Sequence, residues 1–193
     1  MSSATTLSTW VLENYPYTDA ITHLKLQKLL FYSYGIALAY DQASSLGESI
    51  LFQPWEHGPV NREIWQQYRT FQASAIPVHE ARSVAYSPET EKLLRDTLTI
   101  YGLLDAWSLR QQSHLERPWA EAYQQRSALI PTESIREHFQ KKFRRGPVQA
   151  PEYLLDTGTL RLDNIPVQGY PSFAVLAQVL KNAFQNKARL LQS

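Results

Sequence analysis

The sequence predicts a mainly α-helical protein with a small amount of β-structure, and three features carry this prediction. Apolar side chains recur at helical spacing along most of the chain, most regularly between residues 22 and 40. Most of these stretches begin at a residue suited to cap a helix and end near a proline, a glycine or a polar break. Apolar residues make up 44% and charged residues 19% of the 193 residues, which is typical of a globular chain with a sizeable core.

The stretch from Ile21 to Val60 is the one around which we expect the rest of the chain to fold. Thr22 is a suitable N-cap, and the helix predicted after it is apolar on nearly every side, with polar side chains confined to its beginning. A helix of this kind is buried on most sides and belongs at the centre of a core. A short strand is predicted near residues 49–55. A sharp corner is predicted at 56–60, because Gly58 can adopt unusual dihedral angles.

Further helices are predicted on both sides of this stretch. The expected N-caps are Asn61, Ser87 and Asp105, and Trp107 and Leu109–Leu115 are expected to pack inward. The predicted helical segments are 6–14, 61–71, 87–104, 106–115, 119–127, 131–143 and a last amphipathic helix after residue 171. Prolines and glycines gather from residue 146 onward. We therefore predict a domain at 1–145 and an extension at 146–193, with a hairpin near 154–163, packed on the same domain.

Bulk composition excludes several classes of protein. Nineteen basic and eighteen acidic residues give a formal charge of +1, which does not favour a general nucleic-acid or membrane-surface role. The absence of cysteine excludes disulfides, cysteine-ligated zinc and a thiol nucleophile. The sequence shows neither a signal-peptide pattern nor an apolar run long enough to span a membrane. We expect a cytoplasmic protein without a membrane partner.

Two motifs in a fixed order resemble a known family. The first is LKLQKLLFYSYG at residues 24–35, followed by W-x-x-G-P-V at 55–60, and the second is DAWSLRQQSHLERPWAEA at 105–122. Together they resemble the Panacea domain of SocA-like and phage GepA-like antitoxins over about residues 5–125. The residues that match the family pattern are Leu26, Gln27, Lys28, Leu29, Tyr32, Gly58, Pro59, Val60, Ser108, Leu109, His114, Pro118 and Trp119.

The resemblance implies an antitoxin that neutralises a toxin encoded nearby by direct protein–protein binding. In some members of the family the antitoxin instead delivers the toxin to a protease, so a protease is a second implied partner. The resemblance implies no catalytic residue and no cofactor. It does not extend beyond residue 143, so we expect the extension, with the corner at 55–60, to contribute to the choice of toxin.

An enzyme is the alternative that the residues themselves support least. Glu56, His57, His114 and Glu116 are the residue types of a metal site, but no paired-ligand helix such as H-E-x-x-H is present. In the competing interpretation the two histidines hydrogen-bond the backbone at turns. The chain also lacks a Gly-x-Ser-x-Gly turn and a phosphate-binding glycine-rich loop. We expect no metal and no catalysis.

Several residues are candidates for contact with a partner, each with a structural alternative. Tryptophan and arginine are common at binding hot spots, but Trp55 and Trp65 also suit a core. The last helix either closes the fold or lies in a groove of the partner. The basic segment 136–145 is either a solvated helix end or the contact of a nucleic-acid-binding regulator, which is the rival function. The candidate toxin contacts are Trp55, His57, Trp65, Arg144, Arg145, Phe173, Leu176 and Leu180.

Overall fold

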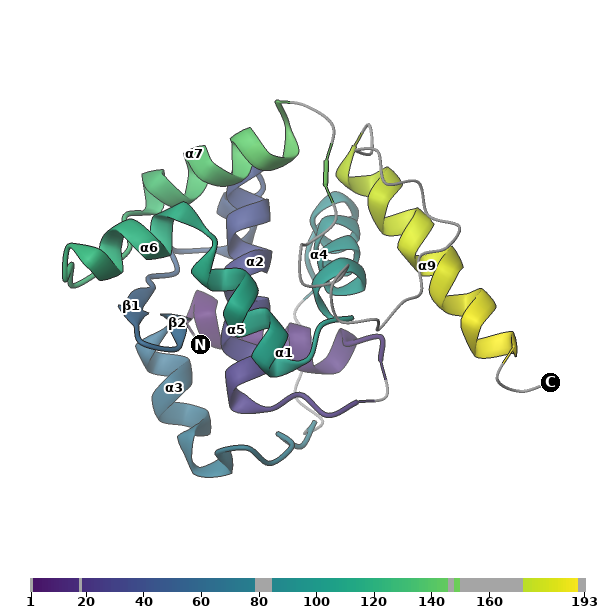
Figure 1. The fold of residues 1–193 in the computed structure, drawn as a ribbon, viewed down its shortest axis with the longest axis horizontal. Coiled ribbons are helices and arrows are strands. Elements are labelled where there is room, and N and C mark those ends of the chain that lie inside the picture. The colour runs from purple at the N-terminus through teal and green to yellow at the C-terminus, as the bar shows by residue number, and fades with distance from the viewer. Residues whose placement is uncertain (1, 18, 79–84, 146–147, 150–171, 191–193) are drawn as a thin grey trace.

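Nearly all the regular structure in the described part of the chain is α-helical, as the sequence predicts. The computed structural model describes residues 2–17, 19–78, 85–145, 148–149 and 172–190 (Figure 1). In these residues the helices surround one central helix, and a two-stranded antiparallel sheet lies at one edge of the bundle. None of the helices in the described ranges is long and apolar enough to cross a membrane.

The central helix is α2 (His23–Ala39), in which all residues except Leu24 are buried. It begins where the sequence predicts, because the Thr22 hydroxyl accepts a hydrogen bond from the backbone N–H of Lys25 at 3.3 Å. Tyr32 stacks on Tyr101 of a neighbouring helix, with 3.8 Å between ring centroids. A helix with apolar residues on every side can be stable in water only when other elements cover all of them.

The elements that cover α2 come from both ends of the sequence. The helices in contact with it include α1 (Ser3–Asn14), α4 (Pro88–Tyr101), α5 (Ala106–His114) and α7 (Thr132–Phe143). In Figure 1, α7 crosses one end of α2, while α4 and α5 lie along its sides. The core is therefore built almost entirely from contacts between distant parts of the chain.

The other three predicted caps, at the starts of α3 (Arg62–Tyr68), α4 and α5, are also present. Asn61 accepts a hydrogen bond from Ile64 N at 3.0 Å and starts α3. Ser87 caps α4, and Asp105 accepts from Ser108 N at 2.7 Å to start α5. Pro118, which falls between the predicted helices 106–115 and 119–127, lies in the first turn of α6 (Arg117–Gln124), where its missing N–H is not needed.

The predicted corner is the turn of a small hairpin. β1 (Gln53–Trp55) and β2 (Gly58–Val60) pair antiparallel, with Trp55 opposite Gly58. Gly58 has a φ of +92°, which other residues rarely adopt. The strand is shorter than the predicted 49–55, because the carbonyls of Leu51 and Phe52 accept hydrogen bonds from the Asn61 side chain and from Ile130 N instead of from a strand.

The amphipathic helix predicted near the C-terminus is present as α9 (Phe173–Leu190), which packs along α4 (Figure 1). Phe173, Leu176 and Leu180 are buried in this contact. The Phe173 ring also lies 5.0 Å from the ring of Phe143 at the end of α7. The hairpin predicted near 154–163 lies outside the described residues.

The structure corrects the predicted orientation of α5. Its buried residues include Ser108, Leu109 and Gln112, and these face the core. Trp107 and Leu115, predicted to pack inward, are 59% and 50% exposed. The prediction is confirmed at Leu109 and wrong at Trp107 and Leu115, because small and polar side chains share the buried face of α5 with Leu109.

Candidate functional site

The polar residues of the first motif attach the hairpin to the central helix. The Gln27 side-chain oxygen accepts a hydrogen bond from Asn61 N at 2.8 Å, and its amide nitrogen donates to Asn61 O at 3.1 Å. This two-way pair fixes the backbone at the junction of β2 and α3. Buried amide groups are expected to form such bonds, because an unsatisfied one is costly.

Lys28 is fully buried beneath the hairpin turn. Its ammonium group donates to the backbone oxygen of Pro59 at 2.8 Å. Burial, together with the charge of Arg110, lowers the pKa of the Lys28 amine to about 7. A Cβ atom on Gly58 would lie 2.5 Å from Ser113 Oγ and 2.9 Å from Lys28 Cε. The turn is therefore packed directly onto α2 and α5.

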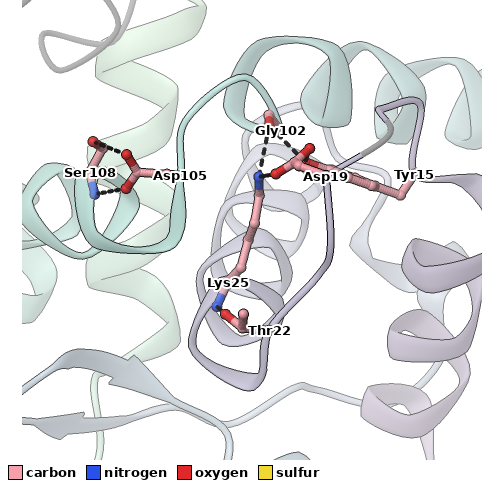
Figure 2. A network of polar contacts seen from close by, with 7 residues as sticks. All are labelled: Tyr15, Asp19, Thr22, Lys25, Gly102, Asp105 and Ser108. Carbon is pink, nitrogen blue, oxygen red and sulfur yellow. Dashed lines mark hydrogen bonds and ion pairs between the residues drawn. The ribbon is translucent and has the colours of Figure 1, made fainter. Parts of the chain in front are cut away.

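Lys25, three residues before Lys28 in α2, makes a second polar network (Figure 2). Its ammonium group contacts the Asp19 carboxylate at 2.6 Å and the Gly102 carbonyl at 3.0 Å. The Tyr15 hydroxyl lies within hydrogen-bond distance of the same two partners, at 2.8 and 2.9 Å, and can donate its one proton to either. Burial and the contact with Asp19 raise the pKa of Tyr15 well above its usual value. The network joins the segment between α1 and α2 to the end of α4.

The second motif supports the hairpin from the side of α5 and α6. Trp119 is buried and donates from its indole nitrogen to the carbonyl of Trp55 at 3.0 Å. His114 stacks on the Trp119 ring at 3.9 Å, and the half-exposed Tyr123 stacks on it at 4.9 Å. His114 also hydrogen-bonds the backbone of Glu56, as one interpretation of the sequence predicts. Burial and the charges of Arg110 and Lys28 lower its pKa to about 4.

Glu116 is a buried carboxylate whose importance the sequence did not indicate. It accepts hydrogen bonds from Tyr32 at 3.1 Å, His138 Nε2 at 2.5 Å and Lys142 Nζ at 2.8 Å. Burial alone would raise the pKa of Glu116, but Lys142 and His138 lower it to about 2. The arrangement cross-links α2, α6 and α7 around one charge.

The four residues considered as metal ligands do not form a metal site. Among the described residues, no group of three histidine, aspartate or glutamate side chains is placed to hold a metal ion. Glu116 is used by Lys142 and His138, and His114 lies flat on Trp119. One interpretation of the sequence has His57 hydrogen-bonding the backbone. In the described residues its Nδ1 instead accepts a hydrogen bond from Arg110 Nε at 3.2 Å.

Aromatic and cationic side chains gather on the surface of the hairpin and its neighbours. At the turn, the Arg110 guanidinium lies 4.9 Å from the centroid of the Trp107 ring and the His57 ring lies 6.1 Å from it. On the other side of the turn, the rings of Trp55 and Trp65 are 5.3 Å apart. We call Trp55, His57, Trp65, Trp107 and Arg110 the hairpin–α5 face. Trp55, His57 and Trp65 are predicted as candidate contacts from the sequence. Trp107 and Arg110 are not, because no local pattern indicates that they are exposed.

Most basic side chains of the segment 136–145 form ion pairs with acidic side chains of the same chain. Arg144 contacts Asp41 at 2.8 Å and the Ala39 carbonyl at 2.9 Å. Arg136 contacts Asp41, Glu133 and the Leu38 carbonyl. Lys141 and Arg145 remain exposed, and both line an open polar cavity of about 870 Å³ next to Glu116.

The other candidate contacts fall into two groups. Phe173, Leu176 and Leu180 are part of the core, so α9 presents none of them to a partner in this structure. The residues that match the family pattern are likewise buried, except for the half-buried His114. At the surface, the hairpin–α5 face brings the candidate contact His57 next to Trp107 and Arg110, which are distant in the sequence.

The helical fold therefore has a buried polar scaffold beneath the hairpin and an exposed aromatic side chain beside the turn. Residues 26–120 match the family model described as "Antitoxin SocA-like, Panacea domain". Over these residues the match confirms the resemblance noted in the sequence. Comparisons with curated proteins and with solved structures give no significant match.

Proposed function

We propose that the protein is an antitoxin that neutralises a cognate toxin by direct binding, and that the hairpin–α5 face makes the contact. The family supports the antitoxin class. The single observation that supports direct binding through this face is the large exposed ring of Trp107 on α5. The guanidinium of Arg110 lies against this ring. Exposed tryptophan and arginine on a preorganised surface are the usual anchors of protein interfaces.

Rigidity is the property that makes this face suitable for a partner. The hairpin is fixed from below by Lys28 and Gln27, and from the side by the hydrogen bond between Trp119 and the Trp55 carbonyl. Side chains that are already ordered lose little conformational entropy when a partner binds. A partner that binds this face therefore meets a hairpin backbone that is already held in place.

The rival function, a nucleic-acid-binding regulator, receives less support. Arg136, His138, Lys142 and Arg144 each contact an acidic side chain of the same chain. Phosphate binding depends on cations that are free to replace counterions. We also propose that the protein is not an enzyme, since its most perturbed acidic and basic groups are buried and engaged in holding the fold.

The proposal is tested by a growth assay with the reading frame adjacent to this gene. We expect expression of the neighbour alone to arrest growth and co-expression of this chain to restore it. The two proteins should then co-purify through a tag on either one. A neighbour that is harmless, or that remains toxic while this chain is abundant and folded, would contradict the proposal. Rescue without co-purification would retain the antitoxin and reject direct binding.

A further inference from the structure

The free polar groups at the tip of the hairpin–α5 face are hydrogen-bond donors. Arg110 donates through Nε to His57 and through one terminal nitrogen to Gln111. Its other terminal nitrogen forms no hydrogen bond within the part of the chain that the structure describes. His57 accepts at Nδ1, so its remaining proton is on Nε2, and the side chain is exposed. The tip therefore offers N–H groups to a partner and calls for an acceptor.

The charge around the tip is positive and lacks a compensating carboxylate. No ion pair joins Arg110 or His57 to an acidic side chain in the described ranges, although Glu56 lies next to His57 in the turn. Behind the turn, Lys28 is buried against a neutral carbonyl oxygen. The charge of Arg110 lowers the pKa of Lys28, and the charges of both lower that of His114, so these basic groups repel one another.

Apolar surface lies directly beside these donors. The Trp107 ring is 59% exposed, with Arg110 against it and the His57 ring nearby. A partner carboxylate placed on Arg110 would be partly shielded from water by this ring, and shielding strengthens a charged hydrogen bond. A phosphate backbone would need a row of free cations, which the tip does not have.

We propose that the hairpin–α5 face binds an acidic segment of the protein partner, with a carboxylate on Arg110 and His57 and an apolar side chain against Trp107. The inference rests on the proposed function, because the partner is the toxin. It adds the chemistry of the toxin surface: at least one aspartate or glutamate beside an exposed apolar residue.

The test is calorimetric titration of the purified full chain with the purified product of the adjacent reading frame, at low and high salt. We expect Arg110→Glu to weaken binding at least about 30-fold, because a like charge then faces the partner carboxylate. Arg110→Gln should bind weakly with little dependence on salt. Lys141→Glu makes the same charge change on an exposed side chain outside the face and should leave the affinity within about twofold. Circular dichroism and melting confirm that each variant is folded.

Each outcome separates the inference from the proposed function. Unchanged affinity of folded Arg110→Glu or Arg110→Gln would overturn the inference while leaving the antitoxin in place. Restoration of Arg110→Glu binding by an aspartate- or glutamate-to-lysine change in the partner would establish the ion pair. Arg110-dependent binding of a short single-stranded oligonucleotide, with no binding of the protein, would assign the site to nucleic acid and overturn it. A wild-type chain that binds no neighbouring product removes both proposals.

Discussion

Polar and basic side chains have two different roles in α2 and in the hairpin–α5 face. Lys25, Gln27 and Lys28 are buried and satisfied by backbone atoms or by Asp19. Arg110 and His57 are satisfied mainly by each other at the surface. The matched residues of the family pattern thus mainly fix the hairpin, whereas the proposed partner contacts His57, Trp107 and Arg110 stand at other positions within the same motifs.

The largest expected effect is on stability, from the buried side of the comparison. Trp119→Ala should lower the free energy of unfolding by about 3–5 kcal/mol, because it removes a buried ring and its hydrogen bond to Trp55 O. Tyr123→Ala, which removes the exposed ring on the other side of the stack, is the matched control and should cost far less. Urea denaturation measures both. A Trp119→Ala variant as stable as wild type would assign this ring to the surface.

The next effect is a dependence on pH that comes from Glu116. Because its pKa falls from 4.5 to about 2 on folding, Glu116 stabilises the folded state by roughly 3 kcal/mol above pH 4.5. This contribution should be lost as the pH falls from about 4.5 to 2, because over this range Glu116 binds a proton in the unfolded state but not in the folded state. Denaturation of wild type and Glu116→Gln across this range should show a difference that shrinks toward low pH. Parallel pH profiles would contradict the assignment.

A smaller effect is expected at the hairpin turn. Gly58→Ala should destabilise the fold by about 1–3 kcal/mol, because alanine is strained at a φ of +92° and its methyl group would meet Ser113 and Lys28. Glu56→Ala, in the same turn but exposed, is the control and should leave the melting temperature nearly unchanged. An equal and small effect of both substitutions would show that the turn is not packed as described.

The smallest effect on stability is expected on the exposed side of the comparison. Trp107→Ala should change the free energy of unfolding by no more than about 0.5 kcal/mol, because the ring is mostly in water. The same substitution should weaken toxin binding by about 2 kcal/mol or more, if Trp107 is an anchor. Calorimetry and denaturation on the same sample measure both quantities. Loss of stability without loss of binding would reverse the roles given to the two regions.

The sequence was informative where structure depends on neighbouring residues. Thr22, Asn61, Ser87 and Asp105 cap helices as expected, because capping involves residues only a few positions apart. The orientation of Trp107 could not be read in this way. The face that a nine-residue helix buries depends on how closely its neighbour approaches, and the buried Ser108 and Gln112 give no apolar stripe.

The candidate site was predictable only in part for the same reason. Trp55, His57 and Trp65 lie close together in the sequence, so their proximity follows from the predicted corner. Arg110 joins them from 53 residues away, through His57. The role of Glu116 depends on His138 and Lys142, which lie 22 and 26 residues further along the chain. Long-range pairs of this kind leave no periodic signal in a single sequence.

The burial of α2 has a consequence for how the protein is made. The last helix that covers α2 is α7, which ends at Phe143. The apolar helix α2 therefore cannot be fully covered until the chain has been synthesised to that residue. At a synthesis rate of roughly 5–20 residues per second, this interval of about 100 residues lasts roughly 5–20 seconds. During that time the nascent chain exposes α2 to chaperones and proteases. Fragments that end before α7 would leave part of α2 uncovered, and we expect them to be degraded.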